Sequence, residues 1–206
     1  KWRERKRIAL LQMKQGFLAK EKYLAKPYIN HKAPENMSFI DNTDEVLEYF
    51  NDAKKLFKDK EKVEFDIKEI SNLTPDTITL MIAKLKDVSY TRKGEFKGEA
   101  PKEPKLRKLF MESGFYNFVA TSKQNKEKTK NLLHKEADYK VRPNIAKQAC
   151  LFGMKHALGR TAPFEPLYEI LVECMQNTNN HASANDEEKL KWWMFVYNCE
   201  DTNTSK

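Results

Sequence analysis

The pattern that most restricts the fold is a strand signal followed closely by the start of a helix. Val63, Phe65 and Ile67 alternate with two acidic residues, which is typical of a half-buried strand. After a turn, Thr74 is placed to cap a helix whose first position is held by Pro75, where the missing N–H costs nothing. Apolar residues continue at helical spacing to residue 85. The chain therefore predicts a strand–turn–helix unit and an α/β fold.

Further elements are predicted on both sides of this unit. Helices are expected where apolar residues recur at three- and four-residue spacing, with proline or glycine marking the ends. Before the central unit we predict a helix over 1–25, a linker over 27–37, a short strand over 37–41 and a helix to about 58. After it we predict a strand over 96–99 and a helix over 106–112 ended by Gly114. The last predicted elements are a helix from Pro143 ended by Gly159, a helix over 167–182 and a strand over 192–197.

The composition argues against several classes of protein. No run of about 18 apolar residues is present, so no helix is expected to cross a membrane. The basic first residues are not followed by the apolar segment of a secretory signal. Cys150, Cys174 and Cys199 form no Cys-x-x-Cys pair and the four histidines are scattered, so neither a disulfide framework nor a zinc site is expected. We therefore predict a cytoplasmic protein with reduced thiols.

The net charge of +8 is concentrated in two segments. Residues 1–26 carry nine basic side chains against two acidic ones, a net charge of +7, and residues 123–147 carry +5. Such segments can bind nucleic acid or another polyanion. The candidate contacts at the start of the chain are Lys1, Arg3, Arg5, Lys6 and Arg7. The alternative is that the two segments are a solvated helix face and a solvated linker.

A row of polar side chains marks the helix predicted over 167–182. Glu173, Asn177 and His181 are four residues apart and therefore stack on one face. The apolar residues between 168 and 175 recur on a different face, which would pack against a core. A carboxylate, an amide and an imidazole in a row suit a metal ion and phosphates. An amphipathic helix with a polar outer face would show the same spacing.

The pattern Glu-x-x-x-Asn-x-x-x-His-Ala resembles the N-box helix of the GHKL (Bergerat-fold) ATPases, which include the histidine-kinase catalytic domains. By that resemblance Glu173 polarises the attacking water or hydroxyl, and Asn177 is a ligand of Mg²⁺. Asn180 and His181 match positions near the nucleotide. The resemblance thus implies ATP and Mg²⁺ as cofactors. The preceding helix and the aromatic strand over 192–197 follow the order of elements in that family.

The resemblance covers only the first half of such a domain. GHKL domains continue with a glycine-containing box that reads adenine and a second one in the ATP lid, and no glycine follows Gly159 here. Glycine lets the backbone approach phosphates closely. ATP and Mg²⁺ are therefore expected only if residues beyond Lys206 complete the domain. The alternatives are a fold that has lost nucleotide chemistry and a subunit of a larger assembly that supplies the missing strands.

Residues 37–119 resemble a STAS domain, the fold of the anti-sigma-factor antagonists. The resemblance rests on the order Val-Glu-Phe-Asp-Ile, turn, helix, Phe-Lys-Gly-Glu-Ala-Pro and Leu-Phe-Met-Glu-Ser-Gly-Phe. STAS switches usually carry a phosphorylatable serine before the second helix, and Pro75 or Asp76 stands there instead. Thr74 has a free hydroxyl, but a helix cap explains it. A regulatory phospho-switch is therefore disfavoured.

These observations predict an α/β (α+β) protein in four parts. They are a basic helical arm at 1–30, a STAS-like domain at 31–120, a polar linker at 121–142 and a partial GHKL-like domain, half of a Bergerat-type α/β sandwich, at 143–206. The leading hypothesis is a cytosolic regulator that acts on a protein partner as an ATP- and Mg²⁺-dependent kinase or an ATP-gated switch. The alternative is a non-enzymatic scaffold that contacts nucleic acid or a partner subunit through its basic arm.

Overall fold

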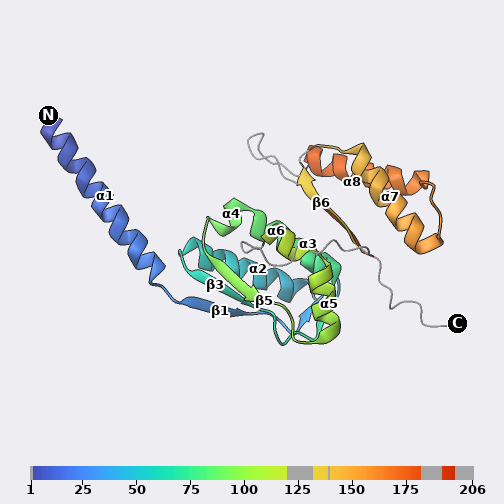
Figure 1. Cartoon of the computed structure of the whole chain (residues 1–206), viewed down its shortest axis with the longest axis horizontal. Helices are drawn as coiled ribbons and strands as arrows, with labels where there is room; N and C mark the ends of the chain where they lie inside the picture. Colours follow the sequence, from blue (N-terminus) through green and yellow to red (C-terminus); the bar gives the residue numbers. More distant parts are fainter. Residues whose placement is uncertain (1, 120–131, 139, 182–191, 198–206) are drawn as a thin grey trace.

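The computed structural model describes residues 2–119, 132–138, 140–181 and 192–197, and it shows a mixed α/β fold, as predicted (Figure 1). The elements up to the central strand are α1 (Trp2–Leu24), β1 (Tyr28–Lys32), β2 (Asn36–Met37), α2 (Thr43–Lys58) and β3 (Lys62–Asp66). They are followed by β4 (Asn72–Leu73), α3 (Pro75–Lys86), α4 (Val88–Thr91), β5 (Phe96–Glu99), α5 (Pro104–Glu112) and α6 (Phe115–Val119). The last elements are β6 (Leu132–Asp138), α7 (Pro143–Leu158), α8 (Glu165–His181) and β7 (Trp192–Tyr197).

Three parallel strands form the main sheet, in the order β1–β3–β5 (Figure 1). Helix α2 connects β1 to β3, and α3 connects β3 to β5. Two right-handed crossovers that advance in the same direction place both helices on one face of the sheet. Val63 and Phe65 of the central strand are buried, whereas Glu64 and Asp66 are only half-buried. One face of the sheet is therefore covered by helices, and the other is lined by charged side chains.

The main core lies between this sheet and helices α2 and α3. Phe50 and Phe57 of α2 and Ile78 of α3 are at most 1% exposed. They belong to one cluster with Phe65 of β3. Burying an apolar side chain of this size contributes about 1.5–3 kcal/mol. The positions that the sequence spaces as helix and strand faces are thus those that build the core.

A second, smaller cluster forms the C-terminal unit. β6 and β7 pair antiparallel, and α7 and α8 pack beside them (Figure 1). Ala146 of α7, Met175 of α8 and Trp192 of β7 form its buried centre. The unit contacts the main core where Trp193 meets Phe118, with ring centroids 5.8 Å apart.

Two segments predicted as linkers contain strands, so those predictions are wrong for the residues concerned. Tyr28–Lys32 forms β1 inside the linker predicted over 27–37. The segment shows no clear alternation because β1 is an edge strand in which only Tyr28 and His31 are half-buried. Leu132–Asp138 forms β6 inside the linker predicted over 121–142. Its partner β7 is distant in the sequence, so no local pattern reveals the pairing.

The strand predicted over 37–41 is shorter than expected. Only Asn36–Met37 pairs, as β2 with β4. The chain then turns, because the Ser38 hydroxyl donates to the Asp41 carboxylate at 2.8 Å. The remaining predicted helices and strands that fall on described residues are present, with ends shifted by a few residues.

Candidate functional site

Helix α8 separates an apolar face from a polar one, as its sequence predicted. Its start is at Glu165, with Pro166 in the first turn. The residues that face the buried cluster are Tyr168, Leu171, Val172 and Met175. Glu173, Asn177 and Asn180 are exposed. His181 is the last residue of α8, and the position of its side chain lies outside what the structure describes.

Glu173 and Asn177 have the freedom that a ligand site requires. They lie one helical turn apart, and their side chains make no hydrogen bond or ion pair with any residue that the structure describes. Within the described ranges, no group of three or more His, Cys, Asp or Glu side chains is arranged to hold a metal ion. Mg²⁺, however, usually keeps several waters and takes one or two protein oxygens together with substrate phosphates. An exposed amide oxygen beside an exposed carboxylate fits a site of that kind.

The connection between α7 and α8 fixes the direction of this polar row. Gly159 ends α7 with a φ of +64°, a left-handed conformation that glycine adopts without strain. The Phe164 N–H then donates to the Cys150 sulfur at 3.2 Å, and the thiol donates to the Phe164 carbonyl at 3.4 Å. The buried thiol of Cys150 therefore holds the residue that precedes α8.

A second candidate site is the basic helix α1. Every side chain from Leu11 to Lys22 is exposed, including Phe17 at 63%. Figure 1 shows α1 leaving the body beside β1 and pointing away from it. The predicted arm is therefore a helix, and the basic side chains described along it, such as Lys14 and Lys20, are accessible.

The arm is held by a buried lysine of the central strand. Lys62 is 5% exposed, and its Nζ donates to the Leu24 carbonyl at 2.8 Å, at the end of α1. The same ammonium lies 3.2 Å from the Glu95 carboxylate. It also lies over the rings of Tyr23 and Tyr28, 5.5 and 5.4 Å from their centroids. Because a cation is favoured at the C-terminus of a helix, Lys62 stabilises the junction between arm and sheet.

The position compared with the STAS phosphorylation site is the start of a helix. Thr74 occupies the N-cap position of α3, but its hydroxyl accepts no helix N–H, so the predicted side-chain cap is not formed; the hydroxyl donates to the Met37 carbonyl at 3.4 Å instead. The Asp76 carboxylate accepts the Phe39 N–H at 3.1 Å. Both side chains therefore join α3 to the loop around β2.

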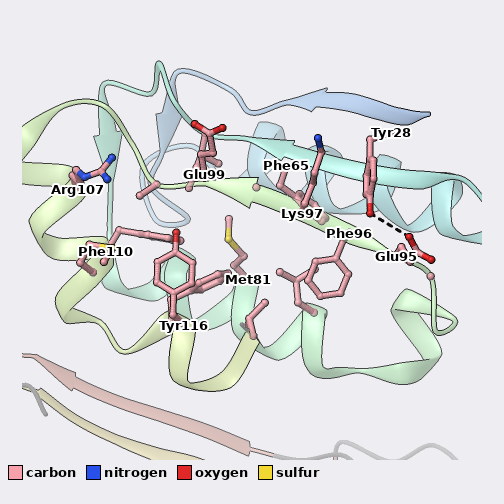
Figure 2. Close-up of a pocket in the computed structure, with 18 residues that line it drawn as sticks. Tyr28, Phe65, Met81, Glu95, Phe96, Lys97, Glu99, Arg107, Phe110 and Tyr116 are labelled. Carbon is pink, nitrogen blue, oxygen red and sulfur yellow. Dashed lines mark hydrogen bonds between the residues drawn. The ribbon is translucent and has the colours of Figure 1, made fainter. Parts of the chain in front are cut away.

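Sequence reasoning missed a groove of about 930 Å³ beside the free edge of β5 (Figure 2). Its apolar lining includes Met81, Leu85, Phe110 and Tyr116, and charged side chains around it include Lys97, Glu99 and Arg107. The signal that could have found it is Gly98, a glycine inside a strand. A Cβ at Gly98 would lie 2.8 Å from the Phe65 carbonyl oxygen, so β5 approaches β3 closely only because this residue is glycine.

Two phenols stand at this groove. Tyr28 donates to the Glu95 carboxylate at 3.2 Å. Desolvation and this hydrogen bond raise the pKa of Tyr28. Burial also raises the pKa of Tyr116, against the opposing charge of Arg107. Both phenols therefore stay protonated at neutral pH and act as hydrogen-bond donors.

No protein-family model, curated protein or solved structure matches this chain. The two resemblances described above therefore rest on the residues of the chain itself. Across the described ranges, no helix has both the length and the apolar character needed to cross a membrane.

Proposed function

We propose that the C-terminal unit, in a protein whose residues beyond Lys206 complete the domain, binds ATP with Mg²⁺, and that the protein then acts as an ATP-dependent kinase or ATP-gated switch on a protein partner. The observation that supports this most is the exposure of Glu173 and Asn177, whose side chains have no partner among the described residues, on the face of α8 opposite the buried Met175. A helix face that is only exposed to water does not require a particular polar residue at a particular position. A carboxylate and an amide one turn apart offer a base and a hard oxygen donor to the same ligand.

The two residues have separate roles in this proposal. The amide oxygen of Asn177 holds Mg²⁺, which neutralises the phosphate charge when bound. The carboxylate of Glu173 orients the attacking water or hydroxyl and accepts its proton. Asn180 and His181, one turn further along α8, contact the phosphates.

Titration calorimetry of the full-length protein with ATP, with and without Mg²⁺, tests this proposal. Asn177→Ala should weaken Mg²⁺-dependent ATP binding by about tenfold or more, the equivalent of one lost charge-assisted contact. Glu173→Ala should leave binding nearly unchanged and slow turnover, because a base acts in the transition state. Gln176→Ala is the matched control, since it removes an exposed amide from the same helix at a position outside the row.

Two results would count against the proposal. One is a full-length protein that binds no ATP. The other is equal behaviour of the Asn177→Ala and Gln176→Ala variants, which would make the row an ordinary solvated helix face.

The second candidate function is a non-enzymatic module that binds a polyanion through its arm. The observation that favours it is the exposed helix α1, which is part of a segment of net charge +7 and is held away from the body. Reversing Arg3, Arg5 and Arg7 to Glu should abolish most of the salt-dependent affinity for a short DNA duplex, measured by fluorescence anisotropy. The charge-matched control reverses Lys105, Arg107 and Lys108 on α5, which are also exposed. Equal losses in the two variants would reject the arm as the binding site.

A further inference from the structure

We propose that the free edge of β5 pairs with β5 of a second copy of this chain, so that two three-stranded sheets join into one sheet of six strands. The sheet order β1–β3–β5 leaves β5 at an edge. An unpaired strand edge is a template for another strand unless something covers it. Three observations on β5 and its surroundings favour the same strand of a second copy as the occupant.

The first observation is the direction of the backbone groups of β5. The Val63 N–H donates to the Glu95 carbonyl at 3.1 Å. In a parallel pair, alternate residues direct their N–H and C=O groups to the same side, so Lys97 and Glu99 also bond toward β3. Phe96 and Gly98 therefore direct theirs outward. Within the described part of the chain no hydrogen bond reaches these outward groups, and Gly98 is exposed.

The second observation is that the sequence of β5 complements itself. A two-fold axis through Gly98 pairs β5 antiparallel with its copy, with Gly98 opposite Gly98 and Phe96 opposite Ala100. Lys97 then stands opposite Glu99 of the second copy, and Glu99 opposite its Lys97. Phe96, Gly98 and Ala100 form the hydrogen-bonded pairs of this antiparallel ladder. Lys97 and Glu99 therefore form the non-hydrogen-bonded pairs, in which opposing side chains are closest. The pairing thus forms two ion pairs of opposite charge.

The third observation is that the edge is exposed at Lys97, Gly98 and Glu99, although Ala100, the next residue, is buried. The side chains of Lys97 and Glu99 are 50% and 69% exposed, and Figure 2 shows both on the side of β5 opposite Phe96. Lys97 lies 3.1 Å from Glu64 and can keep that contact, because an ammonium has three donors. On the other side of β5 is the groove, which gives space to the side chains of an added strand.

The geometry of the sheet also separates the charged arms. α1 leads into β1, which is the edge opposite β5. In the paired sheet the two arms therefore leave from the two outer edges, and their positive charges do not meet at the interface.

Sedimentation velocity over a range of protein concentrations tests the proposal on the full chain. The expected mass is about twice the 24.2 kDa of one chain. Lys97→Glu and Glu99→Lys should each raise the dimer dissociation constant by about tenfold or more, because each places like charges opposite one another twice. The double variant Lys97→Glu/Glu99→Lys should restore pairing. Lys32→Glu is the matched control, since it makes the same reversal on the outer edge strand β1.

The double variant also separates pairing from folding. Lys97→Glu removes the contact with Glu64 in the single and the double variant alike. Recovery of the dimer in the double variant would therefore come from the contact between copies. A chain that stays monomeric at every concentration overturns the proposal and leaves the edge to an extended segment of another protein or to solvent. A dimer that neither single reversal weakens, or that the double variant does not restore, overturns it as well.

Discussion

Replacing Lys62 by methionine tests how the arm is held to the body. Methionine keeps the length of the lysine stem and removes the ammonium. The hydrogen bond to the Leu24 carbonyl, at 2.8 Å, and the ionic contact with Glu95, at 3.2 Å, are then lost. The end of α1 would keep its contact with the sheet through the Tyr23 hydroxyl, which accepts the Glu95 N–H at 2.9 Å. We therefore expect a looser junction rather than a detached arm.

The expected loss of stability follows from opposing contributions at Lys62. A hydrogen bond from a charged donor contributes about 1.5–3 kcal/mol, and a cation over an aromatic ring about 0.5–1 kcal/mol. Removing the ammonium also removes its desolvation cost, which is several kcal/mol for a buried ion. The side chain of Glu95 is 40% exposed, so its carboxylate is hydrated once the lysine is gone. The net loss should be about 1–3 kcal/mol, which lowers Tm by roughly 3–10 °C in a chain of this size.

Two measurements on Lys62→Met check this reasoning. Thermal unfolding followed by circular dichroism gives the change in Tm. Hydrogen exchange over residues 20–26 reports the junction itself, and it should be faster in the variant. The control is Lys55→Met, which removes an exposed ammonium from its pair with Asp52 and should change neither reading. Wild-type Tm together with wild-type exchange in Lys62→Met would refute the role given to the buried lysine.

Four further predictions concern the core and one helix end. Tyr49→Phe should be neutral or stabilise by up to about 1 kcal/mol in urea unfolding, because the buried Tyr49 hydroxyl has no partner among the described residues. Tyr90→Phe should cost about 0.5–1.5 kcal/mol, because it removes the hydrogen bond of 2.6 Å that the Tyr90 hydroxyl donates to the Phe50 carbonyl, and equal effects in the two variants would contradict this account. Burial raises the pKa of Tyr49 above its ordinary value of 10.0, so the unfolded chain releases the phenolic proton first. The stability that the protonated Tyr49 phenol contributes is therefore complete below pH 10. Above pH 10 the free energy of unfolding should fall by about 1.4 kcal/mol per pH unit, and this fall should be absent in Tyr49→Phe. Gly159→Ala should cost about 1 kcal/mol in thermal unfolding, because a φ of +64° strains alanine although space is available; an unchanged Tm would speak against this.

Elements with a strong contrast between core and solvent were predictable from the sequence. β3 is the clearest case, because Val63 and Phe65 face the helices while Glu64 and Asp66 face away. β1 escaped prediction because an edge strand with one polar face buries too little to show a period. β6 escaped because its pairing depends on β7, far along the chain, and on no local signal.

The same contrast explains what could be predicted of the sites. The two faces of α8 follow from helical spacing alone, since Met175 is buried and Glu173 and Asn177 are exposed. Lys62 could not be recognised, because nothing local distinguishes it among 38 basic residues. Its role depends on Leu24 and Glu95, which only the folded sheet brings to one point. The groove at β5 is similar, because its walls come from α3, α5 and α6.

The central strand links two of the surfaces for which binding is proposed, the arm and the free edge of β5. Lys62 contacts the arm at Leu24 and also Glu95, the residue directly before β5. Lys97, by contrast, lies on β5 and contacts Glu64 and the ring of Tyr28 in β1; within the described residues it has no recorded contact with helix α1. Lys62→Met should therefore loosen each arm without separating two copies, and Lys97→Glu should separate the copies without loosening the arms. One polyanion that contacts both arms of the dimer binds the second arm at a high effective concentration. Dissociation of the two copies should then weaken polyanion binding by as much as about 10²-fold.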